Sequence, residues 1–296
     1  MRRRIFYHGA NKKYRYFEGW YLKHESSQCY LSVIPGIYMD RIGRKGAFIQ
    51  LITQDDSYFI QYPYSEFHAS KDFFAIKVGK NYFTKYGMVL NIDSDGVKAK
   101  GAVAYHEFHT VRPNLMGPFS FIPAFPCKHD VISLKHSLVG SIQVNGSEYD
   151  FTDGLGYIET DWGRSFPDGY AWTQCHINKR NNCSIFLAIA EMSIMNKDLY
   201  GCLGFFSYRS RRYKIATYLG AKVLMVRPDK WMVRQGKFRI LVEPKREAIS
   251  NLKAPEEGMM GRNVKENVCS PIRYRVWFDN HLILDQICKN GSYEYL

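Results

Sequence analysis

The sequence lacks the marks of membrane-spanning and secreted proteins. No segment of its 296 residues approaches the run of about 20 apolar residues that a membrane-spanning helix needs. The basic start, MRRRIFYHG, is not followed by an apolar run, so it does not have the pattern of a signal peptide. The seven cysteines are odd in number and scattered without a disulfide-like spacing, which favours a reducing compartment. We therefore expect a cytoplasmic protein.

Motifs for cofactors, metals and nucleophiles are also missing. Neither GxGxxG nor GxxxxGK[ST] occurs, no GxSxG elbow is present, and no CxxC pairs exist. His106-Glu-Phe-His109 is one residue short of the zinc protease pattern HExxH. We expect no cofactor and no metal, and interpret the candidate ligands as histidines and cysteines satisfied within the fold. These candidates are His106, His109, Cys127, His129, His136, Cys175 and His176.

What the chain has in abundance is aromatic residues and positive charge. Hydrophobic residues make up 46% and aromatics 16%, with 22 tyrosines and 19 phenylalanines, which favours a folded, sheet-rich protein. Convincing amphipathic helices are scarce. The 41 basic against 28 acidic residues leave a net charge of +13, which predicts affinity for an anionic partner.

Short apolar or alternating segments predict many β-strands. In the last segment, Ile272, Tyr274, Val276 and Phe278 should face inward, as in a half-buried antiparallel strand. Asn145-Gly146 is typical of a two-residue hairpin, and Asp279-Asn280 is similar. The expected strands are Cys29–Ile34, Ala47–Ile52, Tyr58–Tyr62, Met88–Ile92, Ser184–Ala190, Val223–Val226, Phe238–Val242 and Ile272–Phe278.

An internal repeat divides the chain in two. Trp20 and Cys29 match Trp172 and Cys183, and longer segments from Gly46 and Asn81 match segments from Gly201 and Lys230. The offset stays close to about 150 residues, which indicates tandem copies of one β unit. We expect an all-β protein of two antiparallel barrels or sandwiches, residues 1–150 and 151–296, with few helices.

The stretch from Gly154 to His176 has the highest density of charged and aromatic side chains that could form a functional site. As a strand it places Tyr157, Glu159 and Asp161 on one face. In a partly dry pocket, repulsion would raise the pKa of one carboxyl while Arg164 holds the other ionised, which would give a proton donor. The alternative is a structural corner, because Asp168-Gly169 signals a turn and turn carboxylates are common.

This stretch resembles the tocopherol cyclase family. The resemblance rests on FEGWY from Phe17, GPFSFIP from Gly117, His129 and His136, and above all the pattern GYIExDWGxSFPxxYxWxQ from Gly156 to Gln174. It implies two tandem lipocalin-like (calycin-type) barrels and kinship with carotenoid hydratases. It also implies acid-catalysed ring closure of a prenylated quinol without a redox cofactor.

The resemblance assigns roles to residues of this chain. Glu159 would be the proton donor and Asp161 its orienting partner, with aromatic faces stabilising the cation by about 0.5 to 2 kcal/mol each. The remaining substrate-binding candidates are Tyr157, Trp162, Trp172, Trp20, Glu18, Arg164 and Gln174. Glu18 also suits a structural role, as the buried partner of an arginine that closes a barrel.

Other functions remain open at this point. A non-catalytic lipocalin-like carrier would enclose a hydrophobic, lipid-like ligand without an aligned carboxyl. The basic runs at Arg2–Arg4, Lys12–Arg15, Arg41–Lys45 and Arg209–Lys214 suit peripheral contact with an anionic membrane. Nucleic acid is a weaker alternative, because it would require these runs to form one face. The proline-rich segment Arg112–Lys128 suggests a loop or lid. The sequence does not fix the oligomeric state.

Overall fold

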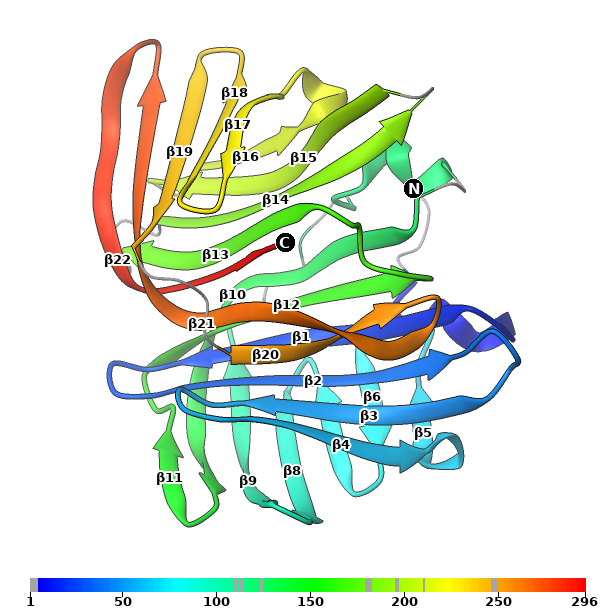
Figure 1. Ribbon diagram of the computed structural model, residues 1–296. Helices are drawn as coiled ribbons and strands as arrows, with labels where there is room; N and C mark the ends of the chain where they lie inside the picture. The colour runs from blue at the N-terminus through cyan, green and yellow to red at the C-terminus, as the bar shows by residue number, and fades with distance from the viewer. Residues whose placement is uncertain are drawn as a thin grey trace. The chain divides into compact units, whose positions relative to one another are not determined.

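The computed structural model describes residues 5–108, 111, 114–122, 125–178, 183–194, 197–209, 211–245 and 250–296. Within these ranges the chain forms strands and short 3-10 helices but no α-helix, so none of its described helices could span a bilayer (Figure 1). The all-β prediction is confirmed. The 3-10 helices are η1 (Gly9–Asn11), η2 (Tyr64–Glu66), η3 (Gly117–Phe121) and η4 (Thr217–Leu219).

Most of the first half of the chain forms one large antiparallel sheet. The strand order is β4-β3-β2-β1-β12-β10-β9-β8-β7-β6-β5, with β11 paired to β10, and no ladder among the described residues joins β4 to β5. Its strands are β1 (Tyr16–Glu25), β2 (Tyr30–Met39), β3 (Lys45–Ile52), β4 (Ser57–Pro63), β5 (Phe67–Ala69), β6 (Ala75–Val78), β7 (Asn81–Thr84), β8 (Gly87–Ser94), β9 (Val97–His106), β10 (Cys127–Val144), β11 (Ser147–Asp150) and β12 (Gly154–Gly163).

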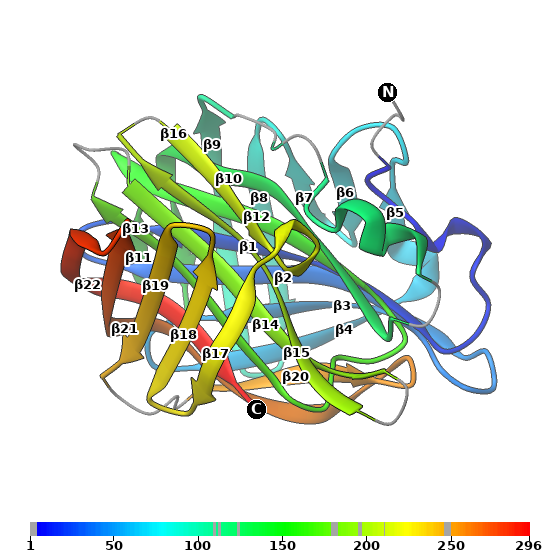
Figure 2. The ribbon, with the colours of Figure 1, turned by 90° about the horizontal axis from the view of Figure 1, so that it is seen from above.

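The rest of the chain forms a second antiparallel sheet. Its order is β16-β15-β14-β13-β22-β21-β19-β18-β17, with β20 paired to β21 (Figure 2). Its strands are β13 (Tyr170–Asn178), β14 (Cys183–Ile194), β15 (Lys197–Tyr208), β16 (Arg211–Ala216), β17 (Lys222–Arg227), β18 (Lys230–Gln235), β19 (Phe238–Pro244), β20 (Ser250–Glu256), β21 (Met259–Phe278) and β22 (His281–Tyr295).

The two sheets share one topology. In each, four strands form a meander (β1–β4 and β13–β16), and the final strand (β12 or β22) returns to pair with the first. This agrees with the tandem repeat inferred from sequence. All eight predicted strand segments lie within strands, apart from Cys29 at the edge of β2. The hairpin prediction at Asn145-Gly146 is confirmed, because both residues have positive φ.

Contacts group the chain into two compact units. The first comprises the chain to Asn114, Pro123–Phe166 and Leu252–Asn263; the second comprises Leu115–Ile122, Pro167–Asn251 and Val264–Leu296. The predicted boundary between residues 150 and 151 falls inside the first unit, because β12 pairs with β1 and β10. Two independently folding domains remain a prediction.

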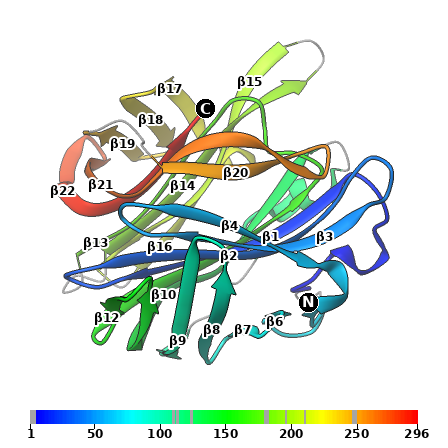
Figure 3. The same ribbon diagram turned by 60° about the horizontal axis from the view of Figure 1, so that its bottom comes forward.

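The first unit also includes a segment from much later in the chain, Leu252–Asn263. Most of β20, drawn in orange in Figure 3, belongs to this unit. The side-chain amide of Gln50 on β3 donates to the carbonyl of Lys253 on β20 at 2.8 Å, and the Lys253 N–H donates to the Gln50 side-chain oxygen at 2.8 Å. Gln50 is almost fully buried, so these two hydrogen bonds satisfy an amide that would otherwise be costly to bury. They fix β20 to the first unit.

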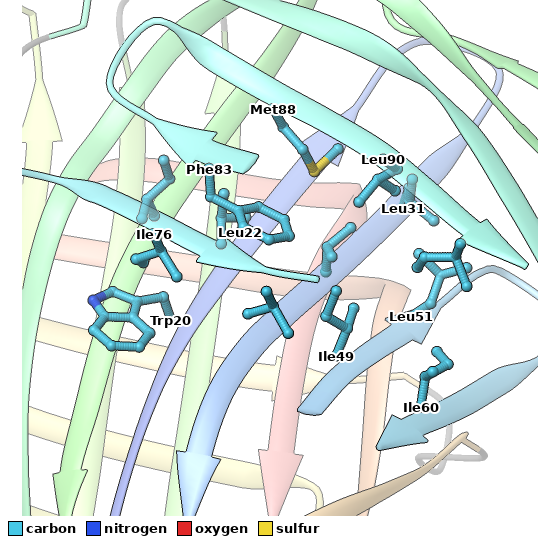
Figure 4. Close-up of a cluster of buried hydrophobic side chains, with 14 of the residues drawn as sticks. Trp20, Leu22, Leu31, Ile49, Leu51, Ile60, Ile76, Phe83, Met88 and Leu90 are labelled. Atoms are coloured by element: carbon cyan, nitrogen blue, oxygen red, sulfur yellow. The ribbon is translucent and has the colours of Figure 1, made fainter. Parts of the chain in front are cut away.

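The core of the first unit lies on one face of its sheet. Trp20 and Leu22 of β1 pack with Leu31, Ile49 and Leu51 of the neighbouring strands (Figure 4). Trp20, Leu31 and Ile49 are fully excluded from solvent, and each buried side chain of this size contributes about 1.5 to 3 kcal/mol. The core therefore takes one face of β1 and β12 and leaves the other for polar residues.

A different core forms in the second unit. Ile272, Tyr274 and Val276 lie in it and are buried, as the alternation of the last predicted strand required. Phe278 departs from that prediction: it is 41% exposed, because it ends β21 beside the turn at Asp279 and Asn280.

Candidate active site

The candidate site lies on the face of β12 opposite the core. Strand alternation places Tyr157, Glu159 and Asp161 together on this face, which confirms the sequence prediction. Antiparallel register then sets their neighbours, because Glu159 lies opposite Tyr21 of β1 and Asp161 lies opposite His129 of β10. The site thus depends on three adjacent strands.

His129 lies between the two carboxylates. Its Nδ1 is 2.6 Å from Asp161 Oδ1, and its Nε2 is 3.3 Å from Glu159 Oε2. The Tyr157 hydroxyl donates to the same Glu159 oxygen at 2.5 Å. Glu159 is 5% exposed and Tyr157 is fully buried, while Asp161 is more accessible. A continuous line of contacts therefore runs from Tyr157 through Glu159 and His129 to Asp161.

Electrostatics decides where the proton lies in this cluster. Burial alone would lower the pKa of His129, but the negative charges of Asp161 and Glu159 and the hydrogen bond to Asp161 outweigh it and raise the pKa to about 9. His129 is therefore an imidazolium at neutral pH. Burial, followed by the charge of Glu159, raises the pKa of Tyr157 far above its usual value, so its hydroxyl remains a donor.

The cluster holds a proton next to a buried carboxyl, which is the arrangement that acid catalysis requires. It is also the group of described residues whose ligand atoms lie close enough to hold a metal ion, within 4.8 Å of one another. The two carboxylates contact opposite nitrogens of one ring, and the proton on that ring offsets one of their two negative charges. A cation would have to displace that proton, and the expected absence of a metal remains a prediction.

The same face carries a second buried charged pair further along β1. Lys23 Nζ lies 3.1 Å from Glu25 Oε2, and both side chains are nearly inaccessible to solvent. Lys23 lies opposite Tyr157 in the β1–β12 register. The polar face therefore extends beyond the His129 cluster.

Glu18 lies on the core side and anchors the N-terminal segment. Its carboxylate accepts hydrogen bonds from the backbone amides of His8 and Gly9 at 2.9 Å and from the Tyr16 hydroxyl at 2.7 Å, and it contacts His8 Nδ1 at 2.9 Å. The His8 ring in turn stacks on Trp162, with centroids 3.9 Å apart. These contacts favour a structural role for Glu18, with His8 and Tyr16 as partners in place of the expected arginine.

Several predicted site residues lie away from the His129 cluster. Trp20 and Trp162 belong to the core of the first unit on the opposite face of the sheet. Arg164 does not hold a carboxylate of the cluster: it is largely exposed, and its Nε lies 4.0 Å from Glu257. His129 takes the role expected of Arg164, because register places it directly opposite Asp161.

Trp172 and Gln174 belong to β13 in the second unit. Trp172 lies opposite Glu294 of β22, and Tyr170 donates a hydrogen bond to Glu294 at 2.5 Å. Glu294 also lies opposite Glu266 of β21, and both glutamates are buried. The second unit therefore has its own buried tyrosine–glutamate pair, which joins β13 to β22, the strand that corresponds to β12, and which sequence reasoning missed.

Of the other metal candidates, Cys127 lies beside the cluster, with its thiol 3.9 Å from Asp161 Oδ1, whereas His136 and His176 belong to different units. His136 lies in the first unit beside Ser133, whose hydroxyl is 3.0 Å from its Nδ1, whereas His176 lies 3.4 Å from Gln174 in the second. Cys175 and Cys288 form a disulfide, which corrects the expectation of unpaired cysteines; their separation of 113 residues left no local signal. His109 lies outside the described residues, as does part of the Arg112–Lys128 segment.

Sequence reasoning named His129 only as a possible metal ligand and in the family resemblance. Its partnership with Asp161 spans 32 residues and depends on the β10–β12 register. Two irregularities in β10, between Val131 and His136, obscure the alternation that would have indicated its face. The available signal was the recurrence of histidine in the run CKHDVISLKH.

Comparison with known proteins gives a family and a set of similar folds. The family model described as Tocopherol cyclase-like matches residues 96–295. No curated protein matches the sequence. Among solved structures, an AttH-type protein of Nitrosomonas europaea has a TM-score of 0.60 at 11% identity, covering 94% of this chain and 92% of its own.

Two further structures have related folds. Kievitone hydratase from Nectria haematococca has a TM-score of 0.54 at 11% identity, covering 99% of this chain and 93% of its own. CghA has a TM-score of 0.60 at 7% identity, covering 95% of this chain and 88% of its own. The predicted fold class, all-β with two tandem lipocalin-like antiparallel barrels, is confirmed, although no ladder among the described residues closes either sheet.

Proposed function

The chain belongs to the tocopherol cyclase-like family, and we propose that it is a cofactor-independent enzyme that protonates a carbon–carbon double bond of an apolar, prenylated substrate. The observation that carries this proposal is the position of His129 between Glu159 and Asp161 on a buried face, where their charges raise its pKa to about 9. His129 would pass its proton to Glu159 when the substrate enters, Glu159 would donate it to the double bond, and Asp161 would orient the imidazole. Tyr157 would fix the rotamer of Glu159 through its hydrogen bond.

The chemistry balances without a redox step. The O–H bond of protonated Glu159 breaks as a C–H bond forms on the alkene, leaving a tertiary cation on the substrate. A hydroxyl of the same molecule attacks the cation and closes a ring, and its proton returns to Glu159. Water in place of that hydroxyl would give hydration, so both outcomes named among the similar proteins, cyclase and hydratase, follow from one first step.

Substrate entry would create the strong acid. An imidazolium with a pKa of about 9 is too weak to protonate an alkene directly. An apolar substrate that displaces water makes the charged His129–Glu159 pair less favourable, because separated charges lose their solvation. The proton would then move across the 3.3 Å contact to Glu159, giving a neutral carboxyl next to the double bond.

The first test compares wild type with Glu159→Gln, each purified from its own host and analysed by native mass spectrometry with lipid extraction. We expect a prenylated precursor on the variant and its cyclised or hydrated product on wild type. Turnover of that precursor should fall by about 10² to 10⁴ in the variant. His129→Gln should give a loss of the same order, because it removes the proton supply.

Glu148→Gln is the matched control, because Glu148 is an exposed carboxylate on β11 that accepts a hydrogen bond only from Ser141 among the described residues. It should retain wild-type product. Finding the same unaltered ligand on wild type and Glu159→Gln would refute acid catalysis and leave a carrier of hydrophobic ligands. Turnover that is lost with EDTA and restored by a divalent cation would instead assign the cluster to a metal.

A further inference from the structure

The second unit has a sheet face that is rich in cations. Strands β17, β18, β19, β21 and β22 are adjacent in its sheet (Figure 2). Their core-facing residues include Trp231, Ile240, Val242 and Val276. Alternation therefore directs the intervening residues to the opposite face. We call this the basic face: it comprises Lys222, Met225, Arg227, Lys230, Met232, Arg234, Arg239, Leu241, Glu243, Arg273, Arg275, Trp277, Leu282, Asp285 and Ile287.

The acidic residues of this face are already paired. Glu243 contacts Arg275 at 2.7 Å and Lys230 at 3.6 Å, and Asp285 contacts Arg273 at 2.7 Å. The other four cations, Lys222, Arg227, Arg234 and Arg239, form no ion pair with any residue that the structure describes. The basic face therefore has seven cations against two anions, and its uncompensated charge lies on β17, β18 and β19.

Three of these unpaired cations form a row. Lys222 lies directly opposite Arg234, and Arg234 lies directly opposite Arg239. Like charges placed opposite each other on neighbouring strands destabilise a sheet. The Nε atom of Arg239 is also buried without a hydrogen-bond partner among the described residues. An anion placed over this row would relieve the repulsion between the like charges.

Apolar side chains accompany the cations. Leu282 and Ile287 are 51% and 60% exposed, and Met225 and Met232 lie opposite each other between the charged rows. Exposed aliphatic residues among cations suit the boundary between lipid headgroups and acyl chains. They contribute nothing to binding a free phosphate.

We propose that the basic face docks the second unit on an anionic phospholipid surface. The four unpaired cations would contact lipid phosphates, and each cation would raise the affinity for the membrane about five-fold. Leu282 and Ile287 would rest at the headgroup boundary. This inference goes beyond the proposed reaction and does not depend on it, since it uses no residue of the His129 cluster.

The geometry of Trp277 favours lipid over nucleic acid. The Arg239 guanidinium lies 4.4 Å from the centre of the Trp277 ring, and that of Arg275 lies 5.7 Å from it. Proteins that bind single-stranded nucleic acid stack bases on open aromatic rings. Two guanidinium groups already contact this ring, so it is poorly suited to such stacking, whereas tryptophan is common at membrane interfaces.

The test is co-sedimentation of the full chain with vesicles, either pure phosphatidylcholine or an equal mixture of phosphatidylcholine and phosphatidylglycerol. We expect binding only to the mixed vesicles, weakening as salt rises. Arg234→Gln combined with Arg239→Gln should weaken it about 30-fold, which corresponds to about 2 kcal/mol. Leu282→Ser combined with Ile287→Ser should weaken the part of binding that persists at high salt.

The matched control is Lys80→Gln combined with Lys100→Gln, two exposed cations of the first unit that change the net charge equally. An equal loss in this control would show that net charge alone drives binding and would overturn the assignment of the basic face. A lack of binding of the wild-type protein to anionic vesicles would also overturn it. If it instead bound a single-stranded oligonucleotide through Arg234 and Arg239, the face would belong to nucleic acid.

Discussion

At the scale of single residues, His129 shows how neighbours determine the state of a side chain. A buried imidazole is normally neutral, because burial disfavours its charged form. Here Asp161 and Glu159 contact its two nitrogens, and their charges reverse the effect and raise its pKa to about 9. Without these carboxylates, burial would keep the same ring neutral at neutral pH.

This reversal can be measured on the residue itself. In wild type, NMR titration of the His129 ring should give a midpoint near pH 9. Asp161→Asn should lower that midpoint by at least about one unit, because the variant removes the nearest negative charge and keeps a similar shape. A midpoint near about 6.5 in wild type would contradict the proton-holding role of His129.

At the scale of an element, β12 carries polar function on one face and close packing on the other. Gly156 lies between His24 of β1 and His136 of β10, which oppose it on either side. A Cβ atom at Gly156 would lie only 2.2 Å from His136 Nε2. This glycine therefore makes room for His136 across the strand.

Gly156→Ala should destabilise the protein by about 1 to 3 kcal/mol, because His136 must leave its position or β12 must shift. The measurement is urea unfolding followed by tryptophan fluorescence. Gly261→Ala is the control: Gly261 also lies in a strand and has no positive φ, and a methyl group added to it would meet no described atom within 4 Å. Equal unfolding midpoints for the two variants would contradict the steric role of Gly156.

At the scale of the whole molecule, two buried histidines limit the pH range of stability from opposite sides. Burial lowers the pKa of His24 to about 4, although its hydrogen bond to the Leu31 carbonyl opposes the shift. Unfolding returns that pKa to about 6.5, so stability should fall as pH drops from about 6.5 towards about 4. The raised pKa of His129 acts oppositely: its stabilisation is complete below about pH 6.5 and is lost as pH rises through about 9.

Stability should therefore peak near about pH 6.5, with each histidine contributing about 3 kcal/mol at most on its side. Urea midpoints measured from about pH 4 to about pH 9 would show this dome. His24→Gln should flatten the acid side only, and His129→Gln the alkaline side only. Identical curves for wild type and both variants would show that other groups control the profile.

Sequence by itself determined the features that depend on neighbours along the chain. Alternation placed Tyr157, Glu159 and Asp161 on one face, and Asn145-Gly146 indicated its hairpin, because side-chain direction and turn conformation are local properties. The repeat of β patterns likewise anticipated two sheets of the same topology. The motif around Glu159 was sufficient to suggest the family that the comparisons establish.

Only the tertiary structure decided which residues meet across strands. The pairing of His129 with Asp161 and the row from Lys222 to Arg239 depend on strand register, and the anchoring of His8 by Glu18 depends on how the N-terminal segment packs on β1. Register is set by bulges and by the packing of whole sheets. The sequence of a single segment does not determine it. For the same reason Arg164, adjacent to the site in sequence, lies near Glu257, while His129, far away in sequence, completes the site.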